Sequence, residues 1–277
     1  MIDVDRAWDR LHTRLVDERL IDRTAKRVVM PFIAKIKLVA AIVALCVVGG
    51  AIGLYLNAKN EKIAHPYLSI HNGDIFNTLV TMLDDGSIVY LAGGATLTCP
   101  ERFVDNKRRV TLHGDALFDV YSDAGSPFVI ETEPVVVEVL GTTFNIKAAD
   151  NHLFELSVHH GLVKVIAKAT GAHLFVEAGE TVRLIDRQQL LKEPSHSPQQ
   201  ITHFAENMRF KDERLENIVH VINRMSHKPI CISDNELKDS EITIAFDNNT
   251  VEEMIALLCV ILDLKYSDDG KEIVIGR

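Results

Sequence analysis

Hydrophobic and polar residues follow a helical spacing at the start of the chain. Val4, Trp8, Leu11 and Leu15 are separated by four, three and four positions within residues 4–20. This spacing places them on one face of a helix. Acidic and basic residues alternate over most of the other positions. We therefore expect an amphipathic helix whose apolar face carries the only tryptophan of the chain.

Residues 1–37 are too few to bury much of a hydrophobic core on their own. The apolar face of the helix therefore needs another surface to lie against. Helices that lie on a membrane are usually rich in lysine and arginine on their polar face, whereas this one mixes acids and bases. A protein partner that takes the helix in a groove fits the pattern better. A helix that packs on a second short helix, or that folds only marginally, is the alternative.

A long apolar stretch without a charged residue follows at residues 38–56. As a helix it would be about 28 Å long, close to the roughly 30 Å of a bilayer core. A buried helix is rarely apolar on every face over this length. A cleaved signal peptide starts at the N-terminus and has a shorter apolar region of about 7–15 residues. We therefore predict a transmembrane helix, with the membrane as a partner of the chain.

Charges on either side of this stretch indicate its orientation. More lysine and arginine residues precede it, among them Lys26, Arg27, Lys35 and Lys37, than follow it closely, where Lys59 and Lys62 lie on either side of Glu61. This asymmetry favours a cytoplasmic N-terminus and places residues 57–277 outside the cytoplasm, which in a bacterium is the periplasm. Gly49, Gly50 and Gly53 would serve helix packing, ease unwinding, or be ordinary transmembrane glycines.

From Tyr67 onward, apolar and polar residues alternate with a period of two. Short alternating runs are separated by glycine-containing turns at roughly 8–12-residue spacing, a pattern typical of an antiparallel sandwich or a coiled sheet. Residues 84–87 read Asp-Asp-Gly-Ser and predict a tight turn, because aspartate and glycine tolerate left-handed backbone geometry. We expect an all-β domain over residues 67–190.

The pattern changes again after a polar, proline-containing linker. Residues 204–277 predict strand, helix, strand, strand, helix, strand and strand, in this order. Thr250 and Glu253 have the spacing of a capping box at the start of the second helix. The tail is therefore expected to form a small α/β domain. The predicted fold class is a multidomain chain with a short cytoplasmic helix, one transmembrane helix, an all-β periplasmic domain and this C-terminal domain.

Composition and charge narrow the classes of function. Hydrophobic residues make up 47 % and charged residues 25 % of the chain, as in folded proteins. The net charge of −9 and the lack of a basic stripe argue against direct nucleic-acid binding.

The sequence contains only weak signals of a catalytic or metal-binding site. The four scattered cysteines form no CxxC pair, and His159–His160 lies in a predicted exposed turn without further ligands. The motifs G-x-S-x-G and H-E-x-x-H and the P-loop motif do not occur in the sequence. We expect a binding and signalling protein and not an enzyme, with no catalytic residues, cofactor or metal.

Three short motifs carry a family resemblance. They are D-G-S at residues 85–87, G-D-A-L-F-D-V at 114–120 and V-L-G-T-T-F-N-I at 139–146. In this order, within residues 80–185, they resemble the FecR-like anti-sigma regulators, in the version with a short cytoplasmic segment that occurs in Bacteroides-type bacteria. The tail is similar to the small C-terminal domain of these regulators. That domain resembles the secretin and TonB short N-terminal domains.

The resemblance implies a single-pass inner-membrane anti-sigma factor with periplasmic C-terminal domains. Residues 1–37 would bind an extracytoplasmic-function sigma factor in the cytoplasm through Val4, Trp8, Leu11 and Leu15, and would thereby regulate transcription. The periplasmic part would sense a TonB-dependent outer-membrane transducer, with docking on the C-terminal domain through a sheet edge. The resemblance also implies regulation by proteolysis of the chain, with an intramembrane protease as a further partner.

Two other classes stay open at this point. A membrane-anchored periplasmic carbohydrate-binding protein would be expected to show exposed aromatic residues on one sheet face, yet aromatic residues are only 6 % of the chain. An envelope-structure protein is suggested by the secretin-like tail, but it would not need the N-terminal amphipathic helix.

Overall fold

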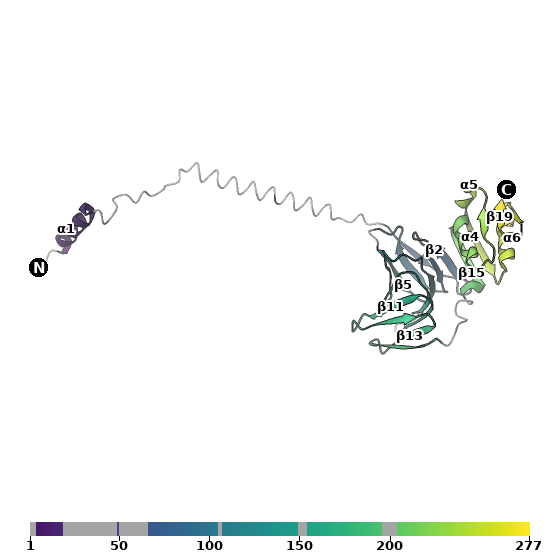
Figure 1. Ribbon diagram of the computed structural model, residues 1–277, viewed down its shortest axis with the longest axis horizontal. Coiled ribbons are helices and arrows are strands. Elements are labelled where there is room, and N and C mark those ends of the chain that lie inside the picture. The colour runs from purple at the N-terminus through teal and green to yellow at the C-terminus, as the bar shows by residue number, and fades with distance from the viewer. Residues whose placement is uncertain (1–3, 19–48, 50–65, 105–106, 149–153, 196–203) are drawn as a thin grey trace. The chain divides into compact units, whose positions relative to one another are not determined.

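The computed structural model describes residues 4–18, 49, 66–104, 107–148, 154–195 and 204–277 (Figure 1). The chain divides into two compact units, Met1–Ala64 and His65–Arg277. In the first unit, helix α1 (Val4–Asp17) confirms the predicted N-terminal helix, which ends at Asp17 and not at residue 20.

The predicted fold class needs two corrections, and the first concerns the membrane. No helix in the described part of the chain is long and apolar enough to cross a membrane. A transmembrane helix is therefore not part of the fold that the structure supports. Residues 38–56, for which this helix was predicted, lie outside the described residues except for Gly49.

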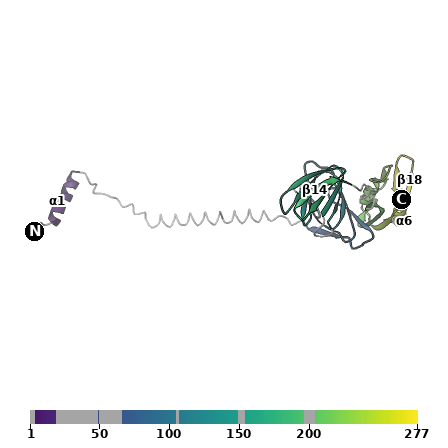
Figure 2. The same ribbon diagram turned by 90° about the horizontal axis from the view of Figure 1, so that it is seen from below.

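Two sheets face each other in the second unit and enclose an apolar core (Figure 2). Within these sheets, the described neighbouring strands are antiparallel except for the pairs β5–β7 and β2–β15. The seven-stranded sheet has the order β1 (Tyr67–His71), β4 (Thr96–Pro100), β5 (Arg108–His113), β7 (Phe128–Glu131), β8 (Val135–Val139), β11 (Leu162–Ala167), β12 (His173–Glu177). The nine-stranded sheet has the order β14 (Gln189–Pro194), β13 (Glu180–Ile185), β10 (Phe154–His160), β9 (Thr143–Lys147), β6 (Ala116–Asp119), β3 (Ile88–Leu91), β2 (Thr78–Met82), β15 (Asn207–Arg214), β17 (Glu241–Asp247).

Alternating side chains build this core, as the period of two predicts. Along β8, residues 135, 137 and 139 are buried valines, whereas Val136 and Glu138 are partly exposed on the outer face. Phenylalanine rings fill the centre, where Phe118 of β6 stacks on Phe144 of β9 with ring centroids 5.5 Å apart. The all-β domain predicted over residues 67–190 is thus a two-sheet sandwich.

A buried arginine organises the turn that opens the sandwich. Asp84–Ser87 forms the predicted turn, with Gly86 in the left-handed region at a φ of 83° and the Leu83 N–H donating to the Ser87 carbonyl at 2.8 Å. Arg108 of β5 is only 4 % exposed, and its Nη1 donates to Asp85 Oδ2 at 2.9 Å.

The remaining contacts of this arginine are to backbone carbonyls and an aromatic ring. Its Nη1 also donates to the carbonyl of Tyr121 at 2.8 Å, and its Nε donates to that of Ser126 at 2.8 Å. The guanidinium lies over the ring of Phe128, 5.6 Å from the centroid. Ser87 completes the arrangement, because its Oγ donates to Asp85 and accepts from the Tyr121 N–H. Burial of the charge is tolerated because each side of the guanidinium is hydrogen-bonded or packed.

The tail follows the predicted order of elements, with one short extra helix. After β15 come α4 (Leu215–Asn223), β16 (Ile230–Ile232), α5 (Asn235–Lys238), β17, α6 (Val251–Leu262), β18 (Lys265–Asp268), β19 (Ile273–Gly276). The last two strands and β16 form a three-stranded sheet of their own. Thr250 and Glu253 make the predicted capping box at the start of α6.

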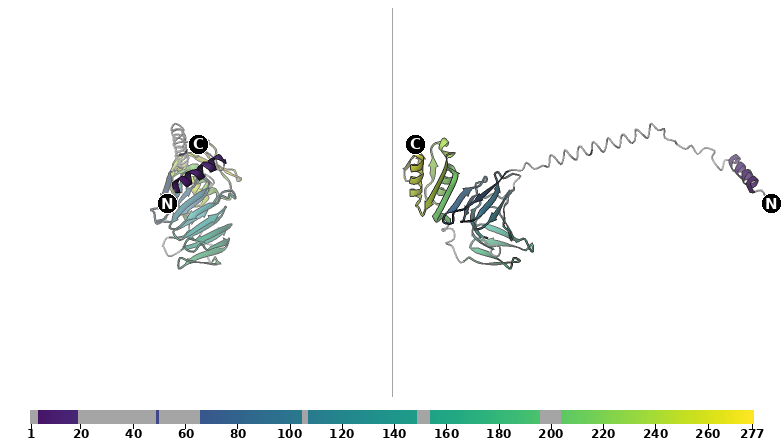
Figure 3. Two further views of the ribbon diagram at one scale, coloured as in Figure 1. Left: turned by 90° about the vertical axis from the view of Figure 1, so that its left-hand side faces the viewer. Right: turned by 180° about the vertical axis from the view of Figure 1, so that it is seen from behind.

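These elements do not form the predicted small α/β domain, which is the second correction to the fold class. β15 pairs in parallel with β2 of the sandwich, so β15 and β17 extend the nine-stranded sheet (Figures 1 and 3). A second core also combines both regions, because the sandwich contributes Val80, Ile88, Tyr90 and Leu117 to it. The tail is thus built onto the outer face of the sandwich.

Replacing Arg108 by leucine should lower the free energy of unfolding by about 3–5 kcal/mol, because Asp85 and the carbonyls of Tyr121, Asp123 and Ser126 would lose their donor in a buried site. Chemical denaturation of residues 65–277, followed by circular dichroism, measures this change.

The neighbouring arginine provides a matched control. Arg109 forms an ion pair with Glu131 on the exposed face of the sheet, so Arg109→Leu should cost less than about 1 kcal/mol. Equal losses in the two variants would show that the Arg108 cluster is not a special source of stability.

Candidate functional site

The predicted sigma-binding residues lie on α1. Leu11 is 48 % exposed and Leu15 is partly exposed, and their spacing of four positions puts them on the same helix face. Asp9 and Arg10 are also exposed. The side chains of Val4 and Trp8 lie outside the described residues, so the structure confirms the helix without testing the full predicted surface.

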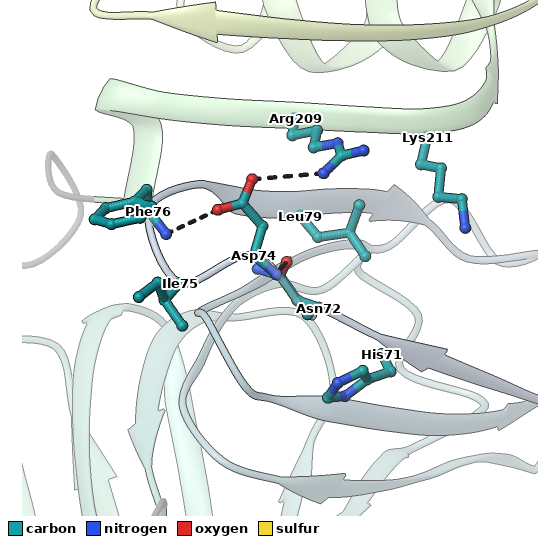
Figure 4. A pocket seen from close by; sticks show the side chains of 9 residues that line it. His71, Asn72, Asp74, Ile75, Phe76, Leu79, Arg209 and Lys211 are labelled. Carbon is teal, nitrogen blue, oxygen red and sulfur yellow. Dashed lines mark hydrogen bonds and ion pairs between the residues drawn. The ribbon is translucent and has the colours of Figure 1, made fainter.

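The junction between the sandwich and the tail is built around the loop between β1 and β2 (Figure 4). Buried Asn72 fixes the loop by donating from Nδ2 to the carbonyls of Asn77 at 2.7 Å and Leu91 at 2.9 Å. Asp74 caps the next turn, since its Oδ1 accepts from the Phe76 N–H at 2.9 Å.

Asp74 also reaches the tail. Its Oδ2 accepts from the side chain of Asn77 at 2.8 Å and lies 3.5 Å from Nη1 of Arg209 on β15. The hydrogen bond from Asn77, the bond from the Phe76 N–H and the Arg209 charge lower the pKa of Asp74. The carboxylate therefore keeps its charge, and its contact with β15, to a lower pH than an isolated aspartate would.

A pocket of about 480 Å³ opens at this junction. Its lining combines polar groups of the loop with Arg209 and Lys211 of β15. Ile75 and Phe76 lie at the tip of the loop with exposed side chains. Figure 4 shows the two cations and Asp74 on facing elements. The lining residues include neither a nucleophile paired with a base nor a set of metal ligands.

Other side chains join the two regions away from the pocket. Arg224, which follows α4, donates from Nε to Asp119 of β6 at 2.8 Å. Asp119 also accepts from Thr143 Oγ1 at 3.0 Å. Tyr90 lies buried close by, and burial raises its pKa far above the usual value, with a further contribution from Asp119. The tail is thus held by strand pairing, apolar packing and ion pairs together.

The V-L-G-T-T-F-N-I motif forms the corner where the chain passes from one sheet to the other. Gly141 is required there, because a Cβ on it would lie 2.5 Å from the Cα of Ser122. The carbonyl of Thr142 accepts from the Val120 N–H at 2.9 Å. The motif therefore supports the fold, and only Leu140 of it is an exposed large apolar residue.

His159 contacts the same motif, and its position differs from the exposed turn that was predicted for His159–His160. His159 is half-buried on β10, and its Nε2 lies 2.9 Å from Oδ1 of Asn145. Burial lowers the pKa of His159 and so favours the neutral ring. Gly161 makes the turn that follows, at a φ of 89°. Across the described ranges, no group of three or more His, Cys, Asp or Glu side chains could hold a metal ion.

An apolar stripe on α6 is a surface that the sequence pattern did not single out. Leu257, Val260 and Ile261 are exposed, Val260 to 79 %, and their spacing of three and four positions makes one continuous stripe. The signal in the sequence is that residues 254–262 are all apolar, although only one side of the helix packs on the core. Such an exposed apolar stripe is typical of a protein-binding surface.

These features define a two-sheet scaffold with a tail packed on it and exposed apolar side chains on α6. Comparison with family models identifies the family: the model for FecR protein matches residues 77–164, and the model for the FecR C-terminal region matches residues 207–275. The chain belongs to the FecR-like anti-sigma factor family.

Solved structures provide a further comparison. The chain is similar to two crystal structures, at 2.50 Å and 1.65 Å resolution, of a proposed anti-sigma factor from Parabacteroides distasonis ATCC 8503. Each of the two is 25 % identical in sequence to this chain. Each match covers 76 % of this chain and 99 % of the crystallised chain, and the TM-scores are 0.47 and 0.45. A search of curated proteins finds no match.

The two family segments should unfold in one transition, because they share a sheet and the second core. Val80→Asp places a carboxylate in that core and should lower the free energy of unfolding by about 3 kcal/mol. Hydrogen exchange of residues 65–277 should show equal losses of protection in β2 and in α4.

Val136→Asp is the matched control, since Val136 lies partly exposed on the outer face of the other sheet. It should leave protection in α4 nearly unchanged. If Val80→Asp weakened β2 while α4 kept its protection, the tail would be an independent domain after all.

Proposed function

We propose that this chain is an anti-sigma factor that binds an extracytoplasmic-function sigma factor through α1 and receives a signal on the unit of residues 65–277. Membership of the FecR-like anti-sigma factor family carries the proposal. It favours this function over a carbohydrate-binding or envelope-structure protein, neither of which gives α1 a role. The separation of the chain into two compact units agrees with one surface for the sigma factor and another for the signal.

The apolar face of α1 is the proposed sigma-binding surface. It consists of Val4, Trp8, Leu11 and Leu15, of which the structure describes the last two side chains as exposed or partly exposed. A short amphipathic helix can lie with this face in a groove of a partner. Trp8 is the expected main contact, because tryptophan dominates the binding energy of many interfaces.

Trp8→Ala together with Leu11→Ala should weaken sigma binding by about 2 kcal/mol or more. This corresponds to an increase in Kd of roughly thirtyfold. A titration of a peptide of residues 1–37 against the sigma factor encoded nearest to the gene measures it.

Asp9→Ala together with Arg10→Ala is the matched control, because these exposed residues lie off the proposed face. This double variant should change the Kd by less than about threefold. The surface would be wrongly assigned if both double variants bound like the wild type.

The stripe of Leu257, Val260 and Ile261 on α6 is the proposed docking surface for a TonB-dependent outer-membrane transducer. Its apolar character and helical spacing suit packing against a helix or sheet face of a folded partner. This replaces strand addition at a sheet edge as the preferred mode, since three exposed apolar side chains of the tail lie together on this helix. A signal bound on α6 can reach the sandwich because the tail and the sandwich share a core.

Val260→Asp together with Ile261→Asp should weaken binding of the transducer's periplasmic signalling domain at least about tenfold, because charges would be buried in an apolar contact. Binding of the full-length variant to the sigma factor should stay at the wild-type level. Calorimetry with the two isolated partners measures both affinities.

Glu252→Ala on the exposed side of α6 should leave both affinities within about twofold of the wild type. A double variant that still bound the transducer normally would exclude α6 as the docking surface without affecting the sigma-binding assignment.

The location of the two surfaces belongs to the same proposal. The N-terminus would lie in the cytoplasm and residues 65–277 in the periplasm, at the inner membrane. An intramembrane protease would take part in releasing the N-terminal segment. Support comes from the family resemblance and from the excess of lysine and arginine before residue 38, and not from a described helix.

A further inference from the structure

The junction pocket, which is the cavity of about 480 Å³ beside the loop between β1 and β2, has two walls of different character. Its volume is within the usual range for ligand-binding sites. The loop contributes Asp74, Ile75 and Phe76 to one wall, and β15 contributes Arg209 and Lys211 to the other (Figure 4). Neither cation has a role in the function proposed for α1 and α6.

Strand β15 directs both cations to the same wall. Arg209 and Lys211 are two positions apart, so they lie on the same face of the strand. Met208 and Phe210 lie on the opposite face and are buried in the second core. A β-bulge begins at Lys211, because the register with β17 shifts between Phe210 and Glu213. Bulges are common beside functional sites, where they re-aim a side chain. The two cations are therefore positioned by a strand and not by a loop.

The junction pocket has more positive than negative charge. Among its lining residues, only Asp74 carries a carboxylate. Its Oδ2 lies 3.5 Å from Arg209 Nη1 and also accepts a hydrogen bond from Asn77. In the part of the chain that the structure describes, Lys211 has no ion-pair partner. One positive charge of the lining is thus left without a counter-charge, in a chain whose net charge is −9.

Neighbouring carboxylates do not compensate this charge, because they are held elsewhere. Asp212 Oδ1 accepts from the Thr243 hydroxyl at 3.0 Å. Glu213 Oε1 accepts from Asn217 Nδ2 at 2.6 Å. Neither carboxylate belongs to a residue that lines the pocket. An anionic group would therefore complement the junction pocket, as opposite charges do across protein interfaces.

The loop presents apolar side chains from a fixed backbone. Ile75 and Phe76 are 74 % and 80 % exposed. The backbone that carries them is held by hydrogen bonds of Asn72 and Asp74. It also lies against Gly93, where a Cβ would be only 2.6 Å from the Cα of Ile75. A loop that is already ordered loses little conformational entropy when a ligand binds to it.

The positions of these groups favour an extended occupant. In Figure 4, Ile75 and Phe76 lie at one end of the pocket and Lys211 lies at the other. His71 also lines the pocket, with its Nδ1 2.9 Å from Thr96 Oγ1. Its Nε2 has no partner among the described residues, so it is available to hydrogen-bond with a peptide group. A peptide contacts both ends of the pocket with two side chains, whereas a small acid reaches only one of them.

We infer that the junction pocket binds an acidic peptide segment of a partner protein. A glutamate or aspartate carboxylate of this segment lies between Arg209 and Lys211. An apolar side chain two positions away packs against Ile75 and Phe76, because residues two apart in an extended peptide face the same side. This site is separate from the α1 and α6 surfaces and does not depend on the function proposed for them.

Amide NMR of residues 65–277, the compact unit that contains both cores, tests the inference. The probe is the blocked peptide acetyl-Gly-Glu-Ser-Phe-Gly-amide, titrated into the millimolar range. It should cause saturable shifts of the amides of residues 73–76 and 209–211. Replacing its glutamate by glutamine should raise the Kd at least about fivefold. A rise in salt concentration from about 20 to about 200 mM should also weaken binding, because exposed charges are screened.

Two variants, each with a matched control, locate the binding energy. Lys211→Gln should raise the Kd of the peptide about three- to fivefold. Lys271→Gln makes the same change of charge on an exposed residue outside the pocket and should leave the Kd unchanged. Phe76→Ser should raise the Kd at least about threefold through lost apolar contact, whereas Phe175→Ser removes an exposed ring elsewhere and should have no effect. Wild-type amide shifts outside the pocket verify that each variant is folded.

Several results would overturn the inference. The peptide could cause no saturable shifts, or its glutamine version could bind as tightly as the glutamate version. Lys211→Gln or Phe76→Ser could bind the peptide as well as the matched control does. Hydrocinnamate, a small acid with an aromatic ring and no peptide group, could bind as tightly as the peptide, which would assign the pocket to small organic acids.

Discussion

The parallel pairing of β15 with β2, and the apolar packing that accompanies it, determine the shape of the second unit. Only two residue pairs form the parallel contact, Met208 with Thr78 and Arg209 with Leu79. The larger contribution comes from the second core, in which the outer faces of β2, β3 and β6 are covered by the tail. Because those faces are apolar, the sandwich without its tail would expose them to water. The two family segments are therefore parts of one folded body.

This constraint separates residues that build the scaffold from residues that are free to make contacts. The D-G-S turn is held by Arg108, and the V-L-G-T-T-F-N-I corner depends on the close approach of Gly141 to Ser122. Most residues of these motifs thus act within the fold. Exposed apolar side chains lie elsewhere, among them Leu11 on α1 and Val260 on the outer side of α6. The residues of the motifs that identify the family therefore serve mainly to pack and stabilise the fold.

Local signals were sufficient for many elements. The period of two predicted the strands because alternate side chains of a strand face opposite sides, and Val135–Val139 shows this directly. The capping box of Thr250 and Glu253 was predictable because it involves only neighbouring residues. Contacts between distant residues left no such signal. Neither the ion pair of Arg224 with Asp119 nor the half-buried position of His159 follows from the spacing around these residues.

The sequence by itself determined the helix α1, the alternating strands, the left-handed turn at Gly86 and the family to which the chain is similar. Each of these depends on residues close together in the chain or on a short motif. The tertiary structure decided that the tail joins the nine-stranded sheet, and it did not support the predicted fold class with a separate α/β domain and a transmembrane helix. It also decided which apolar residues remain exposed. An apolar residue such as Val80 looks the same in a sequence as Val260, and only packing between distant segments buries the first and leaves the second in water.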